Sequence, residues 1–112
     1  MLLRRGATAP ELLTAEGMAV GLDEGPLFDT VLEEKEIGLK EGDLVALYTD
    51  GITEARNPRG EEFTRDRLAG TLLRHEDRSL GEMARTVERF VRRFSALTPR
   101  HDDSTLLLFR LR

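Results

Sequence analysis

Two segments of the chain are largely apolar, without a helical period, and both have the length of a β-strand. Residues 44–49 end abruptly at Asp50-Gly51, and residues 104–109 follow Asp102-Asp103 directly. A run that is apolar on both sides is typical of a strand whose two faces are both covered. The pattern therefore predicts two buried strands, the first of them central in its sheet.

Between these strands the period is helical. Ser79 and Glu82 have the spacing of a capping box, and apolar residues then recur every three or four positions as far as Phe94. Pro99 is expected to end this helix. A second helix is predicted over about residues 64–74, with its first residue as the N-cap of a hydrophobic staple.

The first 43 residues carry weaker patterns. Residues 2–5 and 11–14 predict a short hairpin, and the glycines of residues 17–26 mark an irregular loop. Partial alternation over residues 27–39 indicates a strand, and residues 40–43 predict a turn. Strands, two helices and a final strand together predict an α+β layered domain, with the two helices side by side on one face of an antiparallel sheet.

Composition narrows the class of protein. The 112 residues include no cysteine, which excludes disulfides, thiolate zinc sites and cysteine nucleophiles. No apolar run approaches the roughly 20 residues of a membrane helix, and the first residues lack a secretory signal, so we expect a cytoplasmic protein without a membrane partner.

The charge balance argues against a nucleic-acid partner. The 17 basic and 21 acidic residues give a net charge of −4, whereas a nucleic-acid-binding domain carries a concentrated basic face. The only basic concentration, Arg85 with Arg89, Arg92 and Arg93, falls on the helix that also carries its own apolar stripe. We interpret it as a solvated helix face.

Carboxylates stand at corresponding edges of the two predicted strands. Asp50 follows the first strand and Asp102-Asp103 precedes the second, so antiparallel pairing would bring them to one rim of the sheet. Mg²⁺ and Mn²⁺ prefer such oxygen ligands. The simpler interpretation is a turn at Asp50-Gly51 and a polar strand entry at Asp102-Asp103, and spacing and composition alone favour it.

The sequence motifs themselves resemble those of a known family. Residues 42–55 (GDLVALYTDGITEA), residues 60–63 (GEEF) and residues 102–107 (DDSTLL) closely resemble, in this order, the C-terminal half of SpoIIE-type phosphatases. These belong to the PPM superfamily of metal-dependent serine/threonine protein phosphatases. Residues 19–22 (AVGL) resemble the Pro-Leu-Gly-Leu segment that such domains carry, so the resemblance covers most of the chain.

The resemblance implies an α-β-β-α sandwich with a binuclear Mn²⁺ or Mg²⁺ centre at one end. Asp50 matches the metal-binding aspartate of the family's Asp-Gly motif, and Asp102 matches the one that opens its Asp-Asp motif. Glu54 stands where some members place a ligand for a third metal. No side chain acts as nucleophile in such enzymes, because a metal-activated hydroxide attacks the phosphorus.

The departures from the family are as informative as the match. The Asp-x-x-Gly-His-Gly motif of the family's N-terminal half is absent, so residues 1–112 correspond to the C-terminal portion of such a domain. Each ion takes about six oxygen ligands, which leads us to expect weak metal binding and little or no catalysis by the chain alone. Thr64 stands where the family commonly has glycine.

Two functions follow from the resemblance. The first is hydrolysis of phosphoserine or phosphothreonine on a regulatory protein such as an anti-sigma-factor antagonist in bacterial partner switching. The second is a non-catalytic binding or complementation module derived from such a phosphatase. A third interpretation, outside the resemblance, is an unrelated small α+β protein.

Half of a two-sheet sandwich also leaves an apolar sheet face open, so we expect self-association, with a two-fold homodimer as one arrangement.

Overall fold

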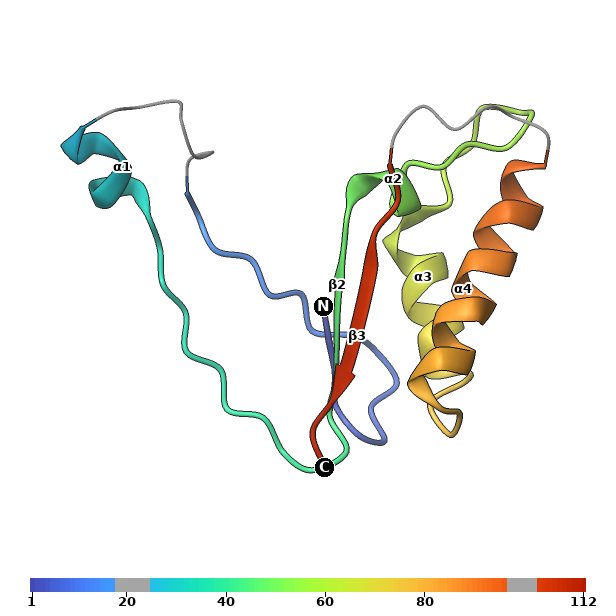
Figure 1. Ribbon diagram of the computed structural model, residues 1–112, viewed down its shortest axis with the longest axis horizontal. Coiled ribbons are helices and arrows are strands. Elements are labelled where there is room, and N and C mark those ends of the chain that lie inside the picture. The colour runs from blue at the N-terminus through green and yellow to red at the C-terminus, as the bar shows by residue number, and fades with distance from the viewer. Residues whose placement is uncertain (18–24, 97–102) are drawn as a thin grey trace.

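A three-stranded antiparallel sheet with helices on one face forms the body of the protein (Figure 1). The computed structural model describes residues 1–17, 25–96 and 103–112; the family-like segment 19–22 and Pro99 lie outside them. The strand order is β1-β2-β3, which confirms the predicted α+β class and the central place of β2. The elements are β1 (Leu2–Leu3), α1 (Pro26–Val31), β2 (Leu44–Tyr48), α2 (Asp50–Thr53), α3 (Thr64–Leu73), α4 (Leu80–Ser95) and β3 (Leu106–Arg110).

The antiparallel pairing of β2 with β3 is the main ladder of the sheet. Leu47 lies opposite Leu107, and Tyr48 lies opposite Leu106. Because the strands run in opposite directions, the end of β2 lies beside the start of β3. This confirms the predicted relation between the two strands.

The capping box at the start of α4 is present as predicted. The backbone N–H of Glu82 donates to the Ser79 hydroxyl at 3.3 Å, and the backbone N–H of Ser79 donates to the Glu82 carboxylate at 3.1 Å. Hydrogen bonds from Ser79 lower the pKa of Glu82. Two N–H groups that helix geometry leaves without partners are thereby satisfied.

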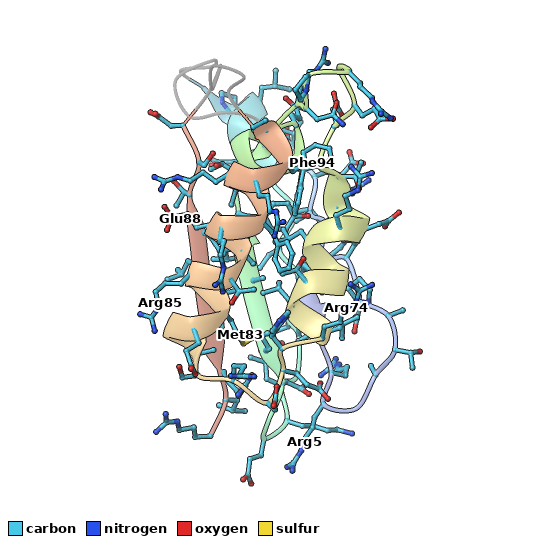
Figure 2. The ribbon with its side chains drawn as sticks, turned by 90° about the vertical axis from the view of Figure 1, so that its right-hand side faces the viewer. Arg5, Arg74, Met83, Arg85, Glu88 and Phe94 are labelled. Atoms are coloured by element: carbon cyan, nitrogen blue, oxygen red, sulfur yellow. The ribbon has the colours of Figure 1, made fainter. Side chains whose placement is uncertain are left out.

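Helices α3 and α4 lie side by side and cover one face of the sheet (Figure 2). Their inward side chains are fully buried, as in Leu68 and Leu72 of α3 and Met83 and Val87 of α4. They pack against the side chains of β2 that point to the same face, including Leu44 and Ala46. Both predicted helices and their shared sheet face are therefore confirmed.

The opposite face of the sheet is open at its β3 edge. Leu47, Leu107 and Phe109 point to this face and are 51%, 54% and 41% exposed. The prediction of two strands buried on both faces was therefore wrong for β3 and for the end of β2. Leu2 and Val45 point to the same face and are buried, but the described residues place no second helical layer over Leu47, Leu107 and Phe109.

The N-terminal segment departs from the predicted pattern. The hairpin is reduced to one antiparallel bridge between Leu2 and Glu11. Residues 27–39 form no strand: the short helix α1 begins at Pro26, whose fixed φ suits a first helical position, and irregular chain follows it. α1 lies apart from the sheet (Figure 1). The turn over residues 40–43 is confirmed, with Gly42 at φ +91°.

Helix α3 has the predicted extent but not the predicted cap. Phe63 occupies the N-cap position and no side chain caps the helix by a hydrogen bond. Thr64 itself has φ +70°, a left-handed conformation in which a β-branched residue is strained. None of the described helices is long and apolar enough to cross a membrane.

Candidate metal site at the end of strand β2

Hydrogen bonds from Thr49 and Ser104 hold the end of β2 against the segment that leads into β3. The Thr49 hydroxyl donates to the carbonyl oxygen of Asp103 at 3.2 Å and accepts from the backbone N–H of Thr105 at 2.9 Å. The Ser104 hydroxyl donates to the carbonyl oxygen of Gly51 at 3.0 Å. Residues more than 50 positions apart in the sequence are thus fixed beside one another.

Gly51 permits the close approach of these two segments. A Cβ at this position would lie 2.8 Å from the carbonyl carbon of Asp103, and closer still to its oxygen. Contacts this short between a Cβ and backbone do not occur, so any larger residue would push the two segments apart. The Asp50-Gly51 pair therefore does more than form a turn: its glycine lets the two acidic segments meet.

Asp50 and Glu54 lie at opposite ends of the single turn α2. Asp50 is its first residue, and the backbone N–H of Glu54 donates to the Asp50 carbonyl at 2.8 Å. Both side chains are exposed, and neither carboxylate makes a hydrogen bond or ion pair with the described residues. Both line a surface groove of about 680 Å³ that also includes Glu62. Carboxylate oxygens are thus available to a ligand at this end of the sheet.

The described residues do not form a complete metal site. No group of three His, Asp or Glu side chains among them is placed to hold a metal ion. Asp102, the third predicted ligand, lies outside the described residues, although its neighbour Asp103 is exposed and adjacent to Gly51. The oxygen donors of Asp50 and Glu54 fit a hard cation such as Mn²⁺ or Mg²⁺, but they are fewer than the about six ligands that each ion takes.

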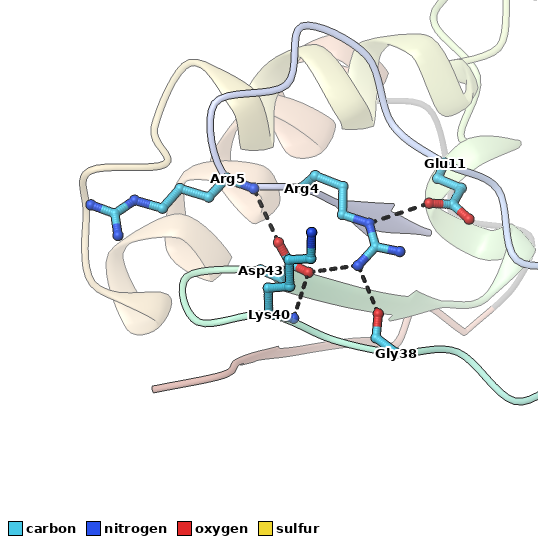
Figure 3. A network of polar contacts seen from close by, with 6 residues as sticks. All are labelled: Arg4, Arg5, Glu11, Gly38, Lys40 and Asp43. Carbon is cyan, nitrogen blue, oxygen red and sulfur yellow. Dashed lines mark hydrogen bonds and ion pairs between the residues drawn. The ribbon is translucent and has the colours of Figure 1, made fainter.

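Sequence reasoning missed the buried carboxylate of Asp43, which directly precedes β2 at the opposite end from Asp50 (Figure 3). It is 2% exposed and accepts hydrogen bonds from the backbone N–H of Lys40 at 2.9 Å and the Arg4 guanidinium at 2.8 Å. The backbone N–H of Arg5 donates to its other oxygen at 3.2 Å. These donors, first Lys40 and then Arg4, lower the pKa of Asp43.

Asp43 has a structural role, because its partners join the turn before β2 to the N-terminal segment. The Arg4 guanidinium also donates to the carbonyl of Gly38 at 2.8 Å and lies 3.4 Å from the Glu11 carboxylate (Figure 3). The only sequence signal is an aspartate directly before an apolar run, and the sequence predicts it as part of the turn over residues 40–43. Asp43 and Arg4 connect three segments of the chain around β1.

Comparison with known proteins gives a family and a fold. The family model described as stage II sporulation protein E (SpoIIE) matches residues 1–112. The solved SiaA-PP2C domain of Pseudomonas aeruginosa is similar in structure, with a TM-score of 0.63 and 28% sequence identity over 68% of this chain. The match covers 31% of that chain, so the protein described here spans about a third of it. A search of the curated proteins gave no match.

Proposed function

Since the chain belongs to the SpoIIE family, we propose that residues 1–112 form the C-terminal portion of a metal-dependent serine/threonine protein phosphatase domain. The family match over the whole chain carries the proposal, and the likeness to a PP2C domain supports the PPM phosphatase type. The matched part is a minority of that domain. The activity of a complete domain therefore requires ligands beyond those that the described residues provide.

Asp50 and Glu54 are the proposed metal ligands, together with Asp102 from the segment before β3. Bound there, Mn²⁺ or Mg²⁺ would lower the pKa of a water molecule and neutralise phosphate oxygens. Thr49 and Gly51 position these ligands: the Thr49 hydroxyl bonds the Asp103 backbone, and Gly51 leaves room for it. The proposed nucleophile is water, and no side chain of the chain forms a covalent intermediate.

The proposed substrate is phosphoserine or phosphothreonine on a regulatory protein. Family membership supports the setting, the partner switching of bacterial sigma factors, in which the substrate is a phosphorylated anti-sigma-factor antagonist. A second candidate function is a non-catalytic module that binds the same partner or completes a separate N-terminal portion. The open apolar face at Leu47, Leu107 and Phe109 favours this candidate, because it offers a surface for another protein layer.

Hydrolysis of p-nitrophenyl phosphate in millimolar Mn²⁺ tests the proposal. We expect little or no turnover by the chain alone, because its described carboxylates do not close a two-metal site. Any Mn²⁺-dependent turnover should be lost in Asp50→Asn and kept in Asp66→Asn, since Asp66 is exposed on α3 and does not line the groove of Asp50. Turnover that survives Asp50→Asn would exclude the proposed ligand.

A further inference from the structure

A groove of about 500 Å³ lies between α3 and α4 on the outer side of the helix layer. Figure 2 looks onto this side, where Phe94 lies between the two helices and Arg74 lies at the end of α3. Its floor reaches the core, because Phe63 lines the groove and is also a buried core residue, whereas Leu72 is buried within the core and does not line it. It is separate from the groove that contains Asp50, and the two share no lining residue.

Aromatic side chains form the floor of this α3–α4 groove. Phe94 packs edge-on against Phe63, with 5.5 Å between ring centroids, and Phe90 beside it is 43% exposed. On the α3 side Gly70 contributes no side chain, and a Cβ added there would meet no atom within 4 Å. The groove is therefore apolar and wide enough for a bulky side chain to enter between the helices.

Arginines surround this apolar floor. The guanidinium of Arg67 lies 4.5 Å from the centroid of the Phe94 ring, where a cation is attracted to the aromatic face. Arg74 and Arg93 also line the groove, and neither has an ion pair with a carboxylate among the described residues. A second basic groove along the outer side of α4 continues past Arg93 to Arg85.

Charge is segregated between the helix layer and the rest of the chain. Residues 64–96 hold eight arginines against five acidic residues, whereas the other residues hold nine basic and 16 acidic ones. The protein as a whole is negative, yet this layer has an excess of positive charge. A partner that is complementary to it is acidic, with an apolar group to fill the groove.

We propose that the α3–α4 groove binds an acidic amphipathic helix of a partner protein. Its apolar side chains would enter beside Phe90 and Phe94, and its carboxylates would meet Arg74 and Arg93, in the helix-in-groove mode of recognition. A nucleic acid fits less well, because its charged backbone gains nothing from an apolar floor. This docking surface goes beyond the proposed phosphatase function and does not depend on the metal site.

A titration of the full chain with a synthetic peptide tests the proposal. The probe is a glutamate-rich helix with leucines at positions i, i+3, i+4 and i+7, and the control peptide has the same composition in scrambled order. Amide signals of Gly70, Thr71, Phe90 and Phe94 are expected to shift with the patterned peptide only. Equal binding of the scrambled peptide, or tighter binding of a single-stranded oligonucleotide, would overturn the proposal.

Three variants distinguish peptide binding in the groove from binding by surface charge alone. Gly70→Leu fills the groove from α3 with a better helix former, so the fold is kept while affinity should fall at least tenfold. Arg93→Glu should weaken binding by a similar factor, whereas Arg59→Glu, on an exposed loop outside the groove, should leave it unchanged. Unaltered affinity in Gly70→Leu would contradict the proposal. Asp50→Asn should also bind normally, which separates this test from that of the metal site.

Discussion

Gly51 and the carbonyl group of Asp103 approach so closely that a Cβ on Gly51 would lie 2.8 Å from the carbonyl carbon. This contact joins the turn after β2 to the segment that enters β3, two parts of the chain that carry acidic residues. The hydroxyl of Ser104, which donates to the Gly51 carbonyl, fixes the same junction. The position of Asp50 relative to the second acidic segment therefore depends on Gly51 having no Cβ.

Gly51→Ala should accordingly lower the free energy of unfolding by about 1–3 kcal/mol, because backbone must move to admit the methyl group. Urea unfolding measures the loss, and the amide shifts of residues 103–105 report the displacement. Gly81→Ala is the matched control: its Cβ would lie 3.7 Å from the Arg85 side chain within α4, and alanine favours a helix. Equal effects of the two substitutions would contradict the packing described.

Thr64→Gly should raise the free energy of unfolding by up to about 1 kcal/mol. Thr64 has φ +70°, where glycine has no steric penalty, and this gain outweighs the larger entropy of an unfolded glycine. Thermal unfolding measures the change, with Thr71→Gly inside α3 as the control. That control should be destabilised by about 0.3 kcal/mol, since glycine is less favourable within a helix than threonine. A loss of stability in both variants would show that Thr64 is unstrained.

The Asp43 carboxylate should contribute to the pH dependence of stability. Its pKa is lowered in the folded protein, so the stabilisation is fully present above the ordinary aspartate pKa of about 4 and is lost as the pH falls through the lowered value. Asp43→Asn should lower the Tm by several degrees at pH 7, because an amide has one acceptor oxygen and no charge, so it cannot accept from Lys40 and Arg4 on one side and from the Arg5 N–H on the other. The difference in Tm between the two proteins should shrink below pH 4, and a constant difference would contradict this account.

The open sheet face should cause self-association. Leu47 and Leu107 lie directly opposite each other on β2 and β3 and are both about half exposed. Sedimentation velocity should show a dimer that forms with increasing concentration, and Leu107→Glu should abolish it. Leu27→Glu is the control, because Leu27 is 52% exposed on α1 and off the sheet. A monomer at all concentrations would count against a role for this face.

The sequence predicted the elements whose signals are local and strong. The apolar run before Asp50 and the capping box at Ser79 each require only neighbouring residues, and both were confirmed. The relation of β2 to β3 was also predicted, because antiparallel strands bring the end of one beside the start of the other. These elements place Asp50 and the segment before β3 at one edge of the sheet.

Other features depend on contacts that no local pattern records. The alternation over residues 27–39 resembled a strand, but a strand needs a neighbour, and Pro26 instead begins a helix. The burial of Asp43 depends on Arg4, almost 40 positions away. The apolar pattern alone predicted Leu107 as buried on both faces, whereas the resemblance to half of a two-sheet sandwich predicted the open face on which Leu107 is exposed. Asp102 lies outside the described residues, so its place remains a prediction.

Line broadening by Mn²⁺ in the amide spectrum tests the central claim, a metal-binding site at the end of β2, most directly. Substoichiometric Mn²⁺ should broaden the signals of residues 49–54 and 103–105 first, with weak affinity, and Asp50→Asn should abolish this selectivity while Asp66→Asn preserves it. Broadening spread over surface carboxylates in general, or unchanged in Asp50→Asn, would contradict the assignment of a phosphatase metal site to this edge of the sheet.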